Sequence, residues 1–293
     1  MRKESFEAAY QAIADYFHDT NTQAFTTFDL SNIFEKNRDS WKIASYRTAK
    51  HFFKYLENSG ILKLKTLKHQ STGSIKTILS KSNANYYDIA LTIKKDGYLS
   101  NYTAMSIHQL TLQIPKSIYI SFMKSDDGRS NSSDVTLSQN SIDQAFAKPQ
   151  RITSEVYKSE IDNYRLFFIQ KGYSEKEIGL ESNQGITYTD LERTLIDIAL
   201  RPAYSGGVFE VLEAYVNARE VIDTNKLYNY LNQLNYIYPY HQLIGFYLEK
   251  ANYEEERYLM FYENISSLKF YLTYNISNKQ YDEKWKIYFP KGF

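Results

Sequence analysis

Hydrophobic residues recur at helical spacing in three successive stretches near the N-terminus. In residues 4–18 the apolar positions return every three or four residues, which predicts an amphipathic helix. A second helix is predicted to begin with Thr27 as its N-cap, and a third with Ser45 as its N-cap. The third helix is expected to end at Gly60, because glycine readily adopts the left-handed conformation that closes helices.

Two stretches after the third helix alternate apolar and polar residues instead. They are "ILKLKTLK" (61–68) and "IKTILS" (75–80), and the turn-rich "HQSTGS" separates them. A period of two on both sides of a turn predicts a β-hairpin. Three helices followed by a hairpin are the layout of a winged helix-turn-helix, so we predict this domain in residues 1–82.

The remainder of the chain mixes both periods and predicts a second, larger domain in residues 83–293. Two short helices are expected within residues 86–110 and strands at 117–123, 151–157 and 164–170. Helices follow at 190–200, 208–218, 223–235 and 238–253, and strands are expected within 266–274 and 284–290. The predicted fold class is α+β: a winged helix-turn-helix domain followed by a mixed α/β domain.

One helix of the second domain carries a row of charged residues. Thr189 and Glu192 form a Thr-x-x-Glu capping box that begins it. Asp190, Arg193 and Asp197 then lie on one face, where the arginine can pair with either carboxylate. Paired carboxylates can perform acid–base chemistry or hold a metal. An arginine between them favours a structural ion pair instead.

Composition limits the chemistry and the cellular location that we expect of the protein. The chain has no cysteine, so disulfides and thiolate chemistry are excluded. The N-terminus shows no signal-peptide pattern, and no stretch approaches 18 apolar residues. These features predict a cytoplasmic protein with no membrane partner.

Charge is distributed unevenly along the chain. The net charge is +1, yet residues 1–82 hold 13 basic and 8 acidic residues, and residues 83–293 hold 22 and 26. Residues 41–81 alone hold 9 basic residues and 1 acidic residue. A basic module joined to a mildly acidic one is typical of nucleic-acid-binding proteins.

The basic residues fall on the elements that a winged helix uses to bind DNA. In that fold the third helix enters the major groove and the wing contacts the backbone. Arg47 or Lys50 can read guanine edges. The alternative is a winged helix used for protein contact, with a solvated basic face. The DNA-binding candidates are Lys42, Tyr46, Arg47, Lys50, His51 and Lys54 on the helix and Lys63, Lys65, Lys68 and Lys76 on the wing.

Four runs of the second domain, taken with the basic N-terminus, resemble a known family. They are "GYLSNYTAMSIHQL", "YTDLERTLIDIALRPAYSGGVFEVLEAY", "HQLIGFYLEKANY" and "YDEKWKIYFP", in that order. The chain is similar over nearly its whole length to the AbiEi antitoxins of bacterial abortive-infection operons. Its polar loop around Asp126–Ser141 is longer than the resemblance leads us to expect.

The resemblance implies a function. The N-terminal domain would bind inverted repeats of double-stranded DNA in its own promoter and repress the operon. The C-terminal domain would counteract a nucleotidyltransferase-like toxin, without requiring a stable complex. Asp190, Arg193 and Asp197 lie in the matching run and are the antitoxin candidates. No catalytic residue, metal or cofactor is expected.

Two other hypotheses remain open from the sequence. The first is an ordinary transcription regulator whose C-terminal domain senses a small ligand or a protein. The second is a nuclease using scattered acidic residues. Its candidates are Asp126, Asp127, Glu155 and Asp162, with Lys158 nearby, although a Mg²⁺ site needs carboxylates that converge in space.

Overall fold

The computed structural model describes residues 6–123, 137–172 and 177–293 of an α+β protein. The chain divides into two compact units, and neither is continuous in sequence. The first unit comprises Met1–Asp96, Ser154–Phe167 and Gln184–Ile186. The second comprises Gly97–Thr153, Phe168–Asn183 and Thr187–Phe293. The first unit therefore extends beyond the boundary predicted after residue 82 and takes in two later segments.

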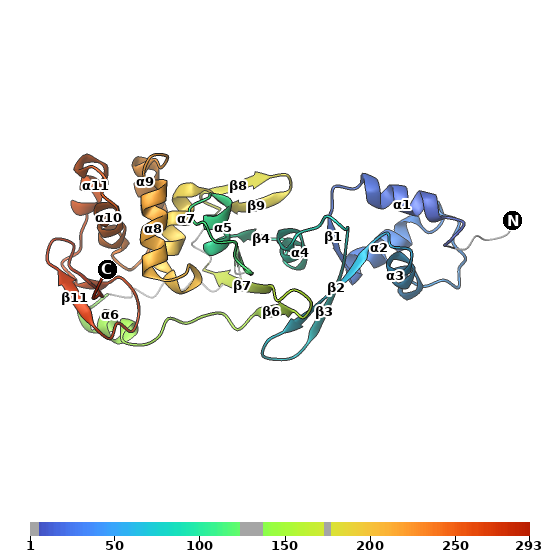
Figure 1. The fold of residues 1–293 in the computed structure, drawn as a ribbon, viewed down its shortest axis with the longest axis horizontal. Helices are drawn as coiled ribbons and strands as arrows, with labels where there is room; N and C mark the ends of the chain where they lie inside the picture. Colours follow the sequence, from blue (N-terminus) through green and yellow to red (C-terminus); the bar gives the residue numbers. More distant parts are fainter. Residues whose placement is uncertain (1–5, 124–136, 173–176) are drawn as a thin grey trace. The chain divides into compact units, whose positions relative to one another are not determined.

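In the described part of the first unit, three helices precede the hairpin, with one short strand between the first two. The hairpin lies where its alternation predicted it (Figure 1). Its elements are α1 (Tyr10–Asp19), β1 (Ala24–Thr26), α2 (Thr27–Asn37), α3 (Ala49–Asn58), β2 (Lys63–His69), β3 (Ile75–Ser80), α4 (Tyr86–Ile93), β6 (Val156–Ser159) and the start of β7 (Arg165–Lys171).

The sheet of the first unit contains a strand from far along the chain. The strand order is β1-β3-β2-β6-β7, and its neighbouring pairs are antiparallel. In β2, Leu67 lies opposite Ser159 of β6, and His69 lies opposite Tyr157. The hairpin β2–β3 is therefore bordered on its β2 side, near the turn, by β6. An exposed strand edge invites pairing with other chains, and β6 covers this one.

Aromatic rings fill the core beneath the helices of the first unit. Phe52 of α3 is fully buried. Its ring centroid lies 5.2 Å from that of Phe34, 5.6 Å from that of Trp41 and 5.8 Å from that of Phe6. Offset and tilted ring pairs at these distances stabilise a core beyond the area they bury. This cluster fixes the face of α3 that points inward and so determines which face points to solvent.

The second unit holds the remaining helices and a small separate sheet, ordered β10-β12-β11. In the described part of the chain, none of the helices is long and apolar enough to cross a membrane. The elements are β4 (Gly97–Leu99), α5 (Tyr102–Ile107), β5 (Ser117–Met123), α6 (Gln139–Phe146), the end of β7, β8 (Leu180–Asn183), β9 (Ile186–Thr189, its first residue in the first unit), α7 (Leu191–Leu200), the 3-10 turn η1 (Pro202–Tyr204), α8 (Val208–Ala218), α9 (Thr224–Leu234), α10 (Tyr240–Lys250), α11 (Glu255–Tyr262), β10 (Phe270–Tyr271), β11 (Lys279–Asp282) and β12 (Ile287–Pro290).

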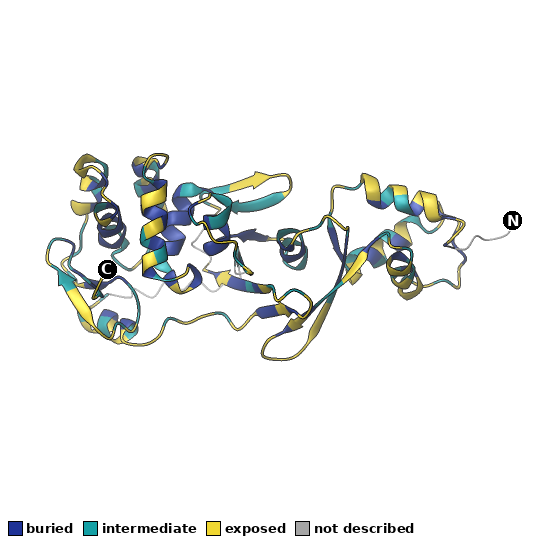
Figure 2. Cartoon of the chain, in the orientation of Figure 1, coloured by how far each residue is buried: buried dark blue, intermediate teal, exposed yellow. Residues whose placement is uncertain are grey.

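Two helices form the centre of the second unit. In α7, residues 192–199 are all buried, and in α10, residues 242–248 are all buried. A helix that is buried on all sides lies inside a domain rather than on its surface. The helices α8, α9 and α11 pack around this pair, and Figure 2 shows α8 buried on one side and exposed on the other.

Three helix starts differ from the sequence-based expectations. Thr26, not Thr27, caps α2, because its hydroxyl accepts from the amide of Asp29 while the Asp29 carboxylate accepts from Thr26 N at 2.9 Å. Asp190, not Thr189, caps α7, with its Oδ1 accepting from Arg193 N at 2.9 Å. In each pair the two neighbouring residues both have capping side chains. The sequence pattern alone therefore does not decide between them.

The third of these differences affects the candidate site. The helix α3 begins at Ala49 with Thr48 as its N-cap, so the prediction that Ser45 caps it is wrong. Trp41 and Ile43 are buried in the aromatic core. Their burial keeps the segment before α3, which includes Ser45, from joining the helix. The guanidinium of Arg38 donates to the carbonyl oxygens of Ser45 and Arg47 and ties that segment down further.

Candidate functional site

The exposed face of α3 carries three of the predicted DNA contacts. Lys50, His51 and Lys54 are exposed on this helix, opposite the side that packs on the aromatic core. Among the residues that the structure describes, neither lysine has an acidic partner within salt-bridge distance. The ring Nδ1 of His51 accepts from Thr48 N at 3.2 Å, so this histidine belongs to the helix cap as well as to the exposed face.

The other three helix candidates lie in the segment before α3. Lys42 is exposed and has a positive φ of 54°, in a turn closed by a bond from its amide to the carbonyl of Asp39. Tyr46 is 72% exposed, which leaves an aromatic ring at the surface beside the basic residues. An exposed ring among lysines is a common element of nucleic-acid surfaces, where it packs on sugars or bases.

Arg47 is placed differently from its neighbours. Its guanidinium carbon lies 5.4 Å from the ring centroid of Phe6 and 5.4 Å from that of Tyr46. Its Nε is buried. Arg47 therefore packs on the edge of the first unit's core as a cation over two rings. The geometry gives it a structural contact that the sequence did not suggest.

The lysines of the β2–β3 hairpin differ in their contacts with β6 and the loop that follows it. Lys65 Nζ lies 3.6 Å from Asp162 Oδ2, and Lys68 Nζ lies 3.8 Å from Glu160 Oε1. Lys76 Nζ lies 5.4 Å from the ring centroid of Tyr157. In the described residues, Lys63 has no such partner. Three of the four predicted wing contacts thus already interact with the neighbouring segment.

A hydrogen-bond network fastens that segment to α4. The hydroxyl of Tyr86 donates to Asp162 Oδ1 at 2.5 Å and lies within hydrogen-bond distance of Ser159 Oγ, at 3.0 Å. The ring of Tyr86 stacks on that of Tyr164 with centroids 4.1 Å apart. Burial raises the pKa of Asp162, but hydrogen bonds from Ser159 and Tyr86 and the charge of Lys65 outweigh it and lower the pKa. Asp162 therefore remains charged and can form an ion pair with Lys65.

The nuclease residues do not form a metal site in the described part of the chain. Asp162 is held in the network above, and Glu155 Oε2 lies 3.6 Å from His69 Nε2. Lys158 lies opposite Lys68 in the β2–β6 pair. Within residues 6–123, 137–172 and 177–293 no three histidine or acidic side chains are grouped to hold a metal ion. Asp126 and Asp127 lie outside the described residues.

The three antitoxin candidates come together in the interior of the second unit. Asp190 is 3% exposed, Arg193 is 0% exposed and Asp197 is 1% exposed. Arg193 Nε donates to Asp197 Oδ1 at 3.1 Å, which confirms an ion pair on one face of the helix. Groups this deeply buried are not available to a partner's surface.

Two lysines from other elements complete this ionic network. Lys171 of β7 is 4% exposed and donates to Asp197 Oδ1 at 3.2 Å. Lys226 of α9 lies 3.0 Å from Asp190 Oδ2 and 2.8 Å from Glu192 Oε2. Sequence reasoning missed both lysines, because nothing local relates a strand or a later helix to the charges on α7.

Burial and charge act in opposite directions on the carboxyl of Asp197. Burial alone would raise its pKa. The charges of Arg193 and Lys171, and their hydrogen bonds, outweigh burial and hold the pKa of Asp197 below its ordinary value. Lys226 is similar: burial lowers its pKa, but hydrogen bonds to Glu192 and Asp190 raise it overall. Asp197 and Lys226 are therefore both ionised near neutral pH.

Comparison with known proteins gives the fold but no family. No protein-family model matches the sequence, and no curated protein matches it. Among solved structures, the crystal structure of the RV2827C protein from Mycobacterium tuberculosis is similar, with a TM-score of 0.57 and 11% sequence identity. The match covers 98% of this chain and 93% of that chain. The chain therefore shares an overall fold with the RV2827C protein across almost its full length.

Proposed function

We propose that this protein is a cytoplasmic bacterial antitoxin that binds double-stranded DNA through its first unit and represses its own promoter. In this proposal α2, α3 and the β2–β3 hairpin work as a winged helix-turn-helix, with α3 in the major groove. The observation that carries it is the exposed basic face of α3, where Lys50 and Lys54 have no acidic partner in the described residues. Phosphates are the partners that such lysines bind best.

The structure alters the contribution expected of each candidate. Lys50 and Lys54 are the proposed phosphate contacts on α3, and the exposed Lys42, Tyr46 and Lys63 are proposed as further contacts. Lys65 and Lys68 already meet carboxylates of the first unit. These two lysines are expected to contribute less to DNA affinity than Lys50 and Lys54.

Replacing both helix lysines, Lys50→Ala with Lys54→Ala, should weaken binding to the protein's own promoter by about tenfold or more. Each lost phosphate contact should also reduce the slope of log Kd against log salt concentration by about 1. The measurement is a gel-shift titration at several salt concentrations with promoter DNA and with scrambled DNA of equal length.

The control for this experiment is Lys279→Ala, which removes one positive charge from an exposed site on β11 in the second unit. It should leave both the affinity and the salt slope unchanged. If the double variant binds as tightly as the wild type with the same slope, α3 does not contact DNA.

The antitoxin part of the proposal rests on the resemblance of the second unit to AbiEi proteins. It predicts that the variant Lys50→Ala/Lys54→Ala, which is impaired in DNA binding, no longer represses the promoter. The same variant should still protect cells from the nucleotidyltransferase-like toxin encoded beside it. Survivors are counted after co-expression from an unrelated promoter, and a reporter reads repression. Death of cells that express the wild-type chain with the toxin would rule out the antitoxin role.

A second candidate function is a transcription regulator whose second unit senses a small ligand. A tyrosine-lined pocket in that unit favours it and is described next. The two functions predict different outcomes in the co-expression experiment, because a plain regulator gives no protection from a toxin. Both place DNA binding on the first unit.

A further inference from the structure

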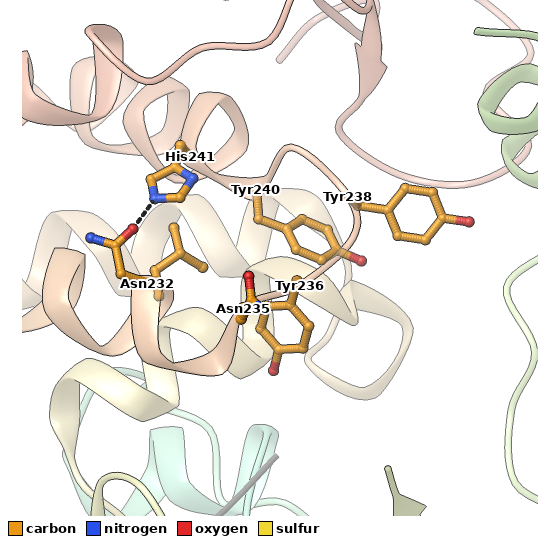
Figure 3. A pocket seen from close by; sticks show the side chains of 7 residues that line it. Asn232, Asn235, Tyr236, Tyr238, Tyr240 and His241 are labelled. Carbon is orange, nitrogen blue, oxygen red and sulfur yellow. Dashed lines mark hydrogen bonds between the residues drawn. The ribbon is translucent and has the colours of Figure 1, made fainter. Parts of the chain in front are cut away.

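A pocket in the second unit lies between the end of α7 and the link from α9 to α10. Its volume is about 270 Å³, near the lower end of the range for small-molecule sites. A smaller hollow of about 70 Å³ shares Asn235, Tyr236, Tyr238 and Tyr240 with it. Figure 3 shows these side chains around the smaller hollow.

Tyrosines provide most of the aromatic surface of the larger pocket. Tyr236, Tyr238 and Tyr240 alternate along the link, and Tyr274 joins them from the segment after β10. The centroid of Tyr240 lies 5.3 Å from that of Tyr236 and 5.9 Å from that of Tyr238. All four tyrosines are half-buried, so each keeps part of its surface accessible. Such rings are suited to stack on a planar ligand.

The charges that line this pocket are positive. Arg201 and Lys171 contribute to its wall, and within the described residues that wall contains no aspartate or glutamate. Lys171 pairs with the buried Asp197. In the part of the chain that the structure describes, the guanidinium of Arg201 makes no hydrogen bond or ion pair, although the residue is half-buried.

The backbone holds Arg201 in place. Its amide donates to the carbonyl of Asp197 at 3.1 Å, and its own carbonyl accepts from Tyr204 N at 2.9 Å. The residue is thus fixed between the last turn of α7 and the 3-10 turn that starts at Pro202. A guanidinium that has no partner among the described residues is available to bind an anion through two parallel hydrogen bonds.

We propose that this pocket binds a nucleoside phosphate, with the base against the tyrosines and the phosphate on Arg201. Tyrosine rings supply the stacking surface, and the guanidinium supplies the charge-assisted hydrogen bonds. A volume of about 270 Å³ is close to that of small-molecule sites, which favours a single nucleotide over a longer strand. This inference does not depend on the function proposed above.

The test uses isothermal titration calorimetry of the full chain with AMP, GMP, CMP and UMP, and with adenosine and inorganic phosphate as separate probes. At least one monophosphate should bind, and adenosine and phosphate should each bind at least about tenfold more weakly. Arg201→Ala should reduce the affinity by about tenfold or more. Tyr238→Ala should reduce it roughly 5- to 150-fold, the range seen when a stacking ring is removed.

The control is Arg219→Ala, which removes an arginine of the second unit that pairs with Glu220 and does not line the pocket. It should bind as the wild type does, and thermal melts show whether each variant is folded. The proposal is overturned by any of three results: no wild-type binding at millimolar monophosphate, equal affinity for adenosine and AMP, or equal affinity of wild type and folded Arg201→Ala.

Discussion

Replacing Asp197 by alanine should lower the free energy of unfolding by about 3–5 kcal/mol. The side chain is 1% exposed and accepts hydrogen bonds from Arg193 and Lys171, which are themselves buried. Removing the carboxylate leaves two buried cations without this anion, and that cost exceeds the loss of any exposed ion pair. Urea denaturation followed by circular dichroism measures it.

The matched control is Glu220→Ala, which breaks an ion pair with Arg219 at a site where the glutamate side chain is 83% exposed. Its cost should stay below about 1 kcal/mol. Equal losses from the two variants would mean that the buried network contributes no more than a surface pair.

The same network should make stability depend on acid pH. Because the pKa of Asp197 is lowered in the folded protein, the unfolded chain takes up this proton first as pH falls. The contribution is complete above the unfolded pKa of about 4 and is lost as pH falls through the folded pKa. In Asp197→Ala the free energy of unfolding should therefore fall less steeply with decreasing pH than in the wild type.

Replacing Gly245 by alanine should also destabilise the protein, by about 2 kcal/mol or more. The glycine is buried within α10, where helix propensity alone would favour alanine by about 1 kcal/mol. A Cβ there would lie 2.2 Å from two ring atoms of Trp285 and 3.1 Å from Phe261 Cβ. Trp285 is 0% exposed, so its ring has no free space to move into, and the clash outweighs the propensity.

A double-mutant cycle tests the cause of that loss. In a Trp285→Phe background the smaller ring leaves room, so Gly245→Ala should cost at least about 1 kcal/mol less than in the wild type. If the cost is the same in both backgrounds, or if Gly245→Ala is stabilising, contact with Trp285 is not what requires glycine.

The sequence predicted elements well where one local signal was strong. The hairpin β2–β3 follows from an alternation on both sides of a turn, and α7 to α10 follow from helical periodicity. Short elements were missed because they carry too few residues to show a period: β1 and β4 have three residues each. The helix α11 was missed as a separate element, because charged residues dominate its first turn.

The candidate site was predictable only in part, for a related reason. The solvent-facing lysines of α3 can be identified from the buried stripe of the same helix, which is a local pattern. The partners of Lys65 and Lys68 come from residues 160 and 162, roughly a hundred positions later, and no local pattern links them. The contact of Arg47 with the ring of Phe6 also joins residues far apart in the sequence, so it could not be predicted, and the assignment of Arg47 as a base-reading residue stays a prediction.

The strand β6 has a consequence for synthesis of the protein on the ribosome. The N-terminal unit includes Ser154–Phe167, so it cannot be completed when Asp96 leaves the exit tunnel. At about 5–20 residues per second, the stretch from Asp96 to Phe167 takes several seconds to appear. During that time β2 has an unpaired edge, and Lys65 and Lys68 have not yet met their carboxylates. A nascent chain in this state carries more free positive charge on its hairpin than the finished protein, so its affinity for polyanions should decline as translation proceeds.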